Sequence, residues 1–426
     1  MKRLLFCLVA LIAVFALVMP ASAAEVKING IWNAKAWARD NYDGDDDRDD
    51  STQYVTQRMR MYFNFIASEN LKLVYKNEID FEWGDASFAN ARNDGGGLGG
   101  DTVNLETKNV YLEFMVPDTP VKATLGLQGV TLHKGWFISD DIGAARFDMN
   151  FDPVSVTAYW AGANGLDADS DSSDDNWQIV ASGAYKAENM DARLTFGYER
   201  KPNDATNANV DSDDLYLVMG EFNMSFDMVS FFVILGTNFG EVDGDGTAAG
   251  DLKERDYEGY MFDVGASFAL DMATIRARFF MASGDDEGDL DEDFQVMSGA
   301  TMSWAELISD GYTYDRNANL TQIGGANKPS NMWAVNVGAD FKPTDTTTLK
   351  FDVYYVGMVE KRTIGGDEED EIGIEIDASL TQKIYDNLSM TILGAYMMAE
   401  DGYGVAGAAN SGDDAFQVGL GLDYSF

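Results

Sequence analysis

The sequence ends with AFQVGLGLDYSF, residues 415–426, in which apolar and polar side chains alternate up to the last residue. Alternation with a period of two is typical of a strand with one apolar face and one polar face. The apolar face consists of Phe416, Val418, Leu420, Leu422, Tyr424 and Phe426. Chain ends usually fray, so a strand that keeps this pattern to its last residue predicts an end that is paired and covered.

Strand-like segments recur along the whole chain, and short and long connections alternate between them. The first three segments run over residues 26–39, 54–67 and 71–83. Short links at 117–120, 151–153, 187–190, 226–228, 270–272, 342–346 and 385–387 alternate with long polar connections at 132–141, 164–175, 201–213, 240–256, 284–330, 361–370 and 400–414. This spacing predicts an all-β protein, a transmembrane antiparallel β-barrel of about 18 strands with 16 as the alternative. Short periplasmic turns and long acidic extracellular loops would connect them.

The membrane explains how a chain can stop in mid-strand. In hydrocarbon every backbone N–H and C=O needs a protein partner, so a sheet that crosses a membrane must close on itself. We therefore predict that the strand starting at Val26 pairs with the strand ending at Phe426. A water-soluble β-sandwich or β-solenoid is the alternative. The outward row of Phe, Tyr, Leu and Val in nearly every segment counts against it.

The N-terminal residues have the features of a secretory signal. Lys2 and Arg3 precede an apolar run that ends at Met19, and Ala21-Ser22-Ala23 supplies the small residues of a cleavage site. We predict a signal peptide over residues 1–23, with cleavage one residue later at 24 as a second option, and a single barrel domain over 24–426. An uncleaved anchor is the alternative, but about 16 apolar residues are fewer than the roughly 20 that span a bilayer.

Composition excludes several classes of protein. Asp and Glu number 72 against 30 Lys and Arg, which gives a formal net charge of -42. We find no basic patch, so nucleic acid is not an expected partner. Aromatic residues at 12% and hydrophobic residues at 46% argue against disorder. The single cysteine, Cys7, lies in the predicted signal, so the mature barrel would contain no disulfide or thiol site.

The aromatic end of the chain, together with loops such as SGDDEGD, resembles the outer-membrane porins of diderm bacteria. It is similar to their terminal assembly signal at Leu420, Leu422, Tyr424 and Phe426. The resemblance implies residence in the outer membrane, with membrane lipid, lipopolysaccharide, periplasmic chaperones and the barrel assembly machinery as partners. It leaves open whether three barrels associate. It covers the mature chain as an architecture but only the last dozen residues as a specific motif.

One predicted hairpin places charged side chains in the lumen. A turn centred on Glu69 sets Arg60 opposite Glu78 and Arg58 opposite Asp80 on the polar face. The predicted pore-lining residues are Arg58, Arg60, Glu78, Asp80, Glu82, Arg276 and Arg278. Separated positive and negative walls would select permeating ions by charge. The alternative is that these are ordinary salt bridges in water, each worth at most about 1 kcal/mol.

The longest connection, residues 284–330, contains the stretch SWAELI. Trp304, Leu307 and Ile308 have helical spacing within it. Porins narrow their channel by folding one loop inside, and this loop is a candidate for that role. A cap on the outer surface is the alternative.

We expect neither a cofactor nor a catalytic site. The acidic runs DGDDDRDD, DADSDSSDD and GDDEGDLDED suit hard cations, yet none fits the full EF-hand pattern. Weak divalent-cation binding that bridges surface lipopolysaccharide is one option, and plain solvated loops are the other. His133 is the only histidine available as a general base, and GGGLGG lacks the strand-to-helix context of a phosphate-binding loop. The sequence therefore does not predict an enzyme.

The function predicted from these features is a water-filled porin for passive diffusion of ions and small hydrophilic solutes, mildly cation-selective because of its acidic loops. A channel for particular sugars or polysaccharides is the alternative, with Trp37, Tyr62 and Tyr354 as candidates for an aromatic ladder along the lumen. A non-conducting surface or adhesin barrel is a third option. It would need a lumen plugged by large apolar side chains, whereas the inward faces here are mostly charged, small or amide-bearing.

Overall fold

The computed structural model describes residues 25–42, 44–47, 51–86, 95–100, 103–162, 176–201, 210–245, 253–286, 291–309, 329–364, 366–403 and 412–426. The predicted signal peptide at 1–23, with Cys7, lies outside these ranges. Among the described residues, no helix is long and apolar enough to cross a membrane.

The described elements are nineteen strands and one short 3-10 turn, η1 (His133–Gly135). The strands are β1 (Glu25–Asp40), β2 (Thr52–Ser68), β3 (Leu71–Glu82), β4 (Glu106–Met115), β5 (Val121–Leu132), β6 (Ile138–Phe151), β7 (Val154–Gly162), β8 (Trp177–Lys186), β9 (Met190–Lys201), β10 (Val210–Phe226), β11 (Val229–Asp245), β12 (Lys253–Asp256), β13 (Tyr260–Ala269), β14 (Ala273–Ala282), β15 (Met332–Thr344), β16 (Thr347–Ile364), β17 (Asp367–Tyr385), β18 (Leu388–Ala399) and β19 (Ala415–Ser425).

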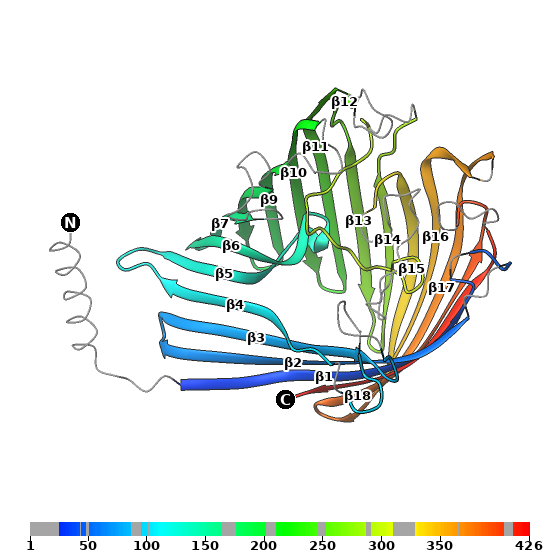
Figure 1. The fold of residues 1–426 in the computed structure, drawn as a ribbon, viewed down its shortest axis with the longest axis horizontal. Coiled ribbons are helices and arrows are strands. Elements are labelled where there is room, and N and C mark those ends of the chain that lie inside the picture. Colours follow the sequence, from blue (N-terminus) through cyan, green and yellow to red (C-terminus); the bar gives the residue numbers. More distant parts are fainter. Residues whose placement is uncertain are drawn as a thin grey trace.

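Apart from β12 and β13, strands that are neighbours in the sequence pair antiparallel, and β19 pairs with β1, so the sheet closes into a barrel (Figure 1). The segments β12 and β13 both pair with β11 and share one position in the wall. The described segments therefore make a closed antiparallel barrel of 18 strands. The prediction of about 18 strands is confirmed, and the alternative of 16 is wrong.

The two ends of the chain meet at the β1–β19 seam. The pairing runs from Ile31 opposite Ser425 to Asp40 opposite Phe416. Beyond it, the Gly30 N–H donates to the Phe426 carbonyl at 2.9 Å, and the Phe426 N–H donates to the Gly30 carbonyl at 3.0 Å. The last strand is thus hydrogen-bonded up to its final residue, as the alternating end of the sequence predicts.

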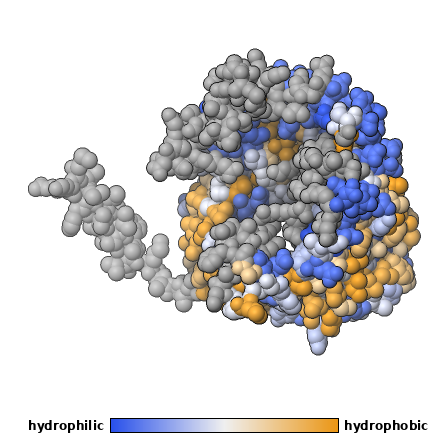
Figure 2. Space-filling view, turned by 45° about the vertical axis from the view of Figure 1, so that its right-hand side comes forward, coloured by the Kyte–Doolittle hydropathy of each residue, from blue (hydrophilic) through white to orange (hydrophobic). Residues whose placement is uncertain are grey.

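The outer face of the barrel is apolar. Alternate residues of nearly every strand leave large hydrophobic side chains exposed, and Figure 2 shows hydrophobic residues gathered on the part of the wall in view, with hydrophilic residues mainly above them. The exposed hydrophobic side chains include Val26, Ile28, Phe65, Leu73, Leu112, Leu125, Phe147, Trp160, Ile179, Leu194, Phe196, Leu235, Ile275, Val337, Phe351, Ile392, Val418 and Leu420. An apolar band around a closed sheet with fully paired strands is what a bilayer requires.

Three predicted long loops differ from the structure. The one at 240–256 is mostly paired strand, because β11 continues to Asp245 and β12 covers Lys253–Asp256. Strands β16 and β17 continue to Ile364 and Asp367, so most of the predicted loop at 361–370 is a paired ribbon. Both of its faces are polar, as in the 3.9 Å pair between Lys361 Nζ and Asp370 Oδ2, which is why its sequence resembles a loop. The predicted polar loop at 132–141 is also wrong, because only residues 133–137 separate β5 from β6 and most of them are buried.

Part of the lumen is filled by two inward-folded segments, residues 132–138 and 291–309, which we call the plug. The Thr301 N–H donates to the Gly135 carbonyl at 3.2 Å and joins the two segments, and the Ser139 N–H of β6, directly after the first segment, donates to the Gly299 carbonyl at 2.9 Å. Gly135 has φ of +98°, and a Cβ there would collide with the Thr301 carbonyl oxygen. The approach of the two segments therefore depends on glycine at this position.

The plug packs against an apolar region of the inner wall. Its buried side chains are Trp136, Phe137, Ile138, Phe294, Met297, Met302, Leu307 and Ile308. The wall residues of the same hydrophobic cluster include Leu215, Leu217, Met219, Ile234, Met261, Phe280, Met332 and Val356. The expectation that inward faces are mostly charged, small or amide-bearing is thus wrong for β10–β16 at this level. Sequence alternation identifies an inward face but not whether a loop covers it.

Candidate functional site: the barrel lumen

The hairpin of β2 and β3 has the register predicted from its turn. Arg60 lies opposite Glu78 and Arg58 opposite Asp80. Arg58 Nη2 is 2.8 Å from Asp80 Oδ2, its Nε is 3.5 Å from Glu78 Oε2, and Arg60 Nε pairs with the same Glu78 oxygen. The arginine side chains are 13% and 21% exposed, whereas those of Glu78 and Asp80 are 1% and 3% exposed. The arginines therefore form the accessible surface of a four-charge cluster. Glu82 ends β3 opposite Thr56 and is half-buried.

Charged side chains continue from this hairpin onto the neighbouring strands. Lys76 Nζ lies 4.7 Å from the ring centroid of Tyr62, and Lys108 Nζ lies 2.7 Å from Asp141 Oδ2. Lys35 of β1 is only 4% exposed and interacts electrostatically with Asp423, Arg58 and Glu306. Lys35 is not among the predicted pore-lining residues, although its place on the polar face of β1 indicates an inward side chain. The wall formed by β1–β4 thus carries cations and anions in alternation.

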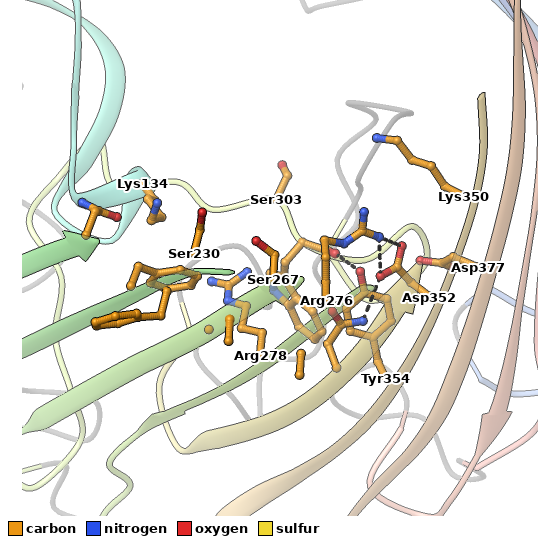
Figure 3. A pocket seen from close by; sticks show the side chains of 18 of the residues that line it. Lys134, Ser230, Ser267, Arg276, Arg278, Ser303, Lys350, Asp352, Tyr354 and Asp377 are labelled. Carbon is orange, nitrogen blue, oxygen red and sulfur yellow. Dashed lines mark hydrogen bonds and ion pairs between the residues drawn. The ribbon is translucent and has the colours of Figure 1, made fainter. Parts of the chain in front are cut away.

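Arg276 and Arg278 lie on the inner face of β14 and are held by aspartates (Figure 3). Arg276 Nη2 is 2.8 Å from Asp352 Oδ2, and its Nη1 pairs with Asp340. Arg278 donates from Nε and Nη2 to the two oxygens of Asp263 at 2.8 and 2.7 Å. Asp263 is fully buried. The structure therefore places both arginines in one region of the lumen. The charged cluster of β2 and β3 is a separate site.

A pocket of about 610 Å³ lies beside these arginines and beneath the plug. Its cationic lining residues are Lys134, Arg276, Arg278 and Lys350, and Figure 3 shows the two lysines at opposite sides of it. Ser230, Ser267, Ser303, Asp352, Tyr354 and Asp377 also line it. The pocket can therefore offer both hydrogen-bond donors and acceptors to a small polar solute.

The stretch SWAELI lies inside the barrel but is not helical. The backbone N–H groups of Glu306, Leu307 and Ile308 all donate to the Glu375 carboxylate of β17, at 2.8, 2.6 and 2.9 Å. Ser309 Oγ accepts from the N–H groups of Trp304 and Ala305. Side chains thus satisfy the amides, and the chain here follows bends instead of a helix. Helical spacing predicted the buried residues but not the backbone.

The predicted aromatic ladder does not form. The Tyr354 hydroxyl donates to the Trp304 carbonyl at 2.5 Å and lies under the plug. Trp37 is 3% exposed, and its ring lies against Gly419. Tyr62 is covered on one face by Lys76. These three rings therefore offer no continuous stacking surface for a sugar chain.

His133 lies buried in the plug and is held by two polar contacts. Its Nε2 lies 2.7 Å from Thr195 Oγ1, and its Nδ1 lies 3.4 Å from Glu221 Oε2. Burial lowers the pKa of His133 below its ordinary value of 6.5 despite the neighbouring Glu221. These contacts hold the imidazole in place between β9 and β10.

The acidic runs are only partly described. The run DADSDSSDD lies outside the described residues. In GDDEGDLDED, oxygens of Asp285, Asp286 and Glu292 lie within 4.8 Å of one another. Partial desolvation, followed by the charges of Asp286 and Asp285, raises the pKa of Glu292 above its ordinary value. Such repulsion is compatible with weak cation binding and with a solvated loop alike.

The predicted assembly-signal residues lie on the outer face of β19. Leu420, Tyr424 and Phe426 are 46%, 37% and 45% exposed, and Leu422 is half-buried. The rings of Tyr424 and Phe426 stack with centroids 5.7 Å apart. These side chains are therefore available at the barrel surface next to the seam.

Comparisons with known proteins find likeness in structure only. No family model matches the sequence, and no curated protein matches it. Among solved structures, Pseudomonas aeruginosa OpdO is 14% identical with a TM-score of 0.60, covering 94% of this chain and 97% of that one. P. aeruginosa OccK2 (OpdF) in complex with glucuronate is 12% identical with a TM-score of 0.60, covering 94% and 96%. P. aeruginosa OpdK with vanillate is 11% identical with a TM-score of 0.59, covering 94% and 98%. The chain therefore has the fold of these Pseudomonas outer-membrane porins.

Proposed function

We propose that this protein is an outer-membrane channel for ions and small hydrophilic solutes. One observation carries the proposal: a closed wall is apolar outside, while the inner face of β1–β4 is lined by accessible charged groups such as Arg58 and Arg60. An apolar exterior suits a bilayer, and a charged interior suits water and ions. The pathway would follow this charged wall, because the plug packs against the wall of β10–β16.

Mild cation selectivity is the second part of the proposal. Acidic residues outnumber basic ones by 72 to 30 and are concentrated in the long connections. Their summed potential would enrich cations at the channel mouths at low salt. Within the lumen, the arginines are largely neutralised by the carboxylates beside them. The acidic loops therefore supply most of the uncompensated charge.

Uptake of particular small solutes is a second candidate, favoured by the pocket beneath the plug. Two similar solved structures contain glucuronate and vanillate, both of which carry a carboxylate. Lys134 and Lys350 would give such a solute two cationic contacts across a pocket of about 610 Å³. A sugar channel with an aromatic ladder has less support, because the ladder does not form. The apolar plug is compatible with a non-conducting adhesin. The charged wall beside it counts against this alternative, because a sealed barrel has no use for a charged inner surface.

Membrane residence and partners belong to the same proposal. We expect delivery through the signal at 1–23, insertion by the barrel assembly machinery with periplasmic chaperones, and contact with lipid and lipopolysaccharide. Association of three barrels would be measured by native electrophoresis of the detergent-extracted protein.

Planar bilayers test the channel directly. The full mature chain, purified from outer membranes, should produce stepwise conductance that increases with salt concentration. Glucuronate or vanillate at millimolar concentration should reduce the current if the pocket lies on the pathway. A folded barrel that gives no conductance would contradict the proposal. A conductance unaffected by either solute would contradict only the second candidate.

A further inference from the structure

The contact between Glu375 and the plug is unusually specific for a wall-to-loop contact. Glu375 is fully buried, and three successive backbone N–H groups converge on its carboxylate. Converging amides of this kind form an anion-binding nest, and hydrogen bonds to an ionised acceptor are about twice as strong as neutral ones. Here the anion belongs to the barrel wall. The nest therefore fixes one short plug segment to β17.

The same segment is fixed on either side of Glu306. Before it, Tyr354 binds the Trp304 carbonyl, and after it Ser309 Oγ bonds to the Ala305 carbonyl at 3.0 Å as well as to two amides. Asp377 accepts a second, longer bond from the Glu306 N–H at 3.2 Å. The backbone of Glu306 is thus held at its own amide and at both neighbours.

The side chain of Glu306 has a different environment from its backbone. It is only partly buried, it lines the pocket beneath the plug, and it interacts electrostatically with Lys35 on β1. Leu307 and Ile308, which share the nest, are almost completely buried. Glu306 is the charged residue of the segment 304–308, and its side chain faces the lumen. It brings a negative charge within electrostatic reach of Lys35 on the wall of β1–β4.

We infer that Glu306 is a selectivity-determining residue of the lumen and that Glu375 is the positioning residue that holds it there. The inference rests on the proposed channel function. A fixed carboxylate on the plug, near cations on the wall, sets the sign and strength of the field that a permeating ion crosses. Sequence alone does not place Glu306 there, because it lies in a loop of more than 40 residues.

Glu306→Gln removes one charge while it preserves shape. For an ion that passes about 7 Å away in water, this should lower the cation-to-anion permeability ratio by about threefold at low salt. Glu375→Gln should act indirectly, because its amide keeps one acceptor oxygen but sets an N–H donor against the Ile308 N–H, which weakens the hold on the segment. It should produce a change in the same direction. Glu188→Gln, at an exposed turn between β8 and β9, is the matched control and should leave the ratio unchanged.

The double variant separates positioning from a general structural effect. If Glu375 acts through Glu306, adding Glu375→Gln to Glu306→Gln should change the permeability ratio no further. Additive changes would overturn the positioning role, and a wild-type ratio in Glu306→Gln would overturn the selectivity role. Heat-modifiable migration in electrophoresis would verify that each barrel is folded.

A cysteine substitution at Glu306 tests the selectivity role even if the Glu375→Gln variant does not fold. Since Cys7 lies in the predicted signal, Glu306→Cys would be the only thiol of the mature chain. A negatively charged methanethiosulfonate reagent should restore the wild-type ratio, and a positively charged reagent should lower it further. No response to either reagent would contradict the lumen placement. Absence of any channel in the wild type would instead contradict the proposed function itself.

Discussion

Replacing Arg58 and Arg60 together by serine should make the channel markedly more cation-selective. The four-charge cluster of Arg58, Arg60, Glu78 and Asp80 has no net charge, and the double substitution leaves two carboxylates. Two such charges about 10 Å from a permeating cation in water attract it by about 0.8 kcal/mol in total. That corresponds to a roughly fourfold higher local concentration, which screening at 0.1 M salt reduces to roughly 1.6-fold.

Reversal potentials across a tenfold salt gradient measure this change. The shift should shrink when both solutions contain about 1 M salt, where the Debye length is about 3 Å. The control is the quadruple variant with Glu78→Gln and Asp80→Asn added, which again has no net charge and should return to the wild-type potential. An unchanged reversal potential in the double variant, or a shift that persists in the quadruple variant, would refute the reasoning.

Three further predictions concern assembly and stability. Deleting Phe426 removes both backbone hydrogen bonds to Gly30 and an aromatic ring of the assembly signal, so heat-modifiable barrel in outer membranes should fall while secretion continues; wild-type amounts would contradict this. Gly419→Leu should destabilise the barrel by about 1–3 kcal/mol, because its side chain would occupy the site of the Trp37 ring, and urea unfolding in detergent would measure the loss. The lowered pKa of His133 means that the unfolded chain binds a proton before the folded one, so stability should decline as pH falls below about 6.5, and His133→Gln should flatten that pH profile.

Sequence reasoning succeeded where a local rule determines long-range geometry. The turn at Glu69 fixes the register of β2 on β3, because a strand alternates with a period of two and a tight turn allows one offset. The same logic identified the inward face of β14 at Arg276. Closure of β1 on β19 followed from the need to satisfy backbone groups in lipid.

It failed where the outcome depends on contacts between distant segments. Trp136 lies in a connection, and no local pattern indicates that its ring packs against Phe280 of β14 and Phe294 of the second plug segment, with centroids 5.6 and 6.3 Å away. The three amides that bind Glu375 come from residues almost 70 positions earlier in the chain. A bulky run such as HKGWF, between strands that otherwise end in acidic loops, was nevertheless a signal of burial.

The seam between β1 and β19 also bears on the kinetics of assembly. Its pairs join positions from opposite ends of the sequence, so they have the largest separation of any ladder in the barrel. Closing so long a loop costs more chain entropy than forming any of the neighbouring hairpins, and non-local pairings form slowly. Until it forms, the first and last strands each present an unpaired edge that can capture another chain. The final ladder is therefore the step at which a catalyst that holds both edges would accelerate folding most.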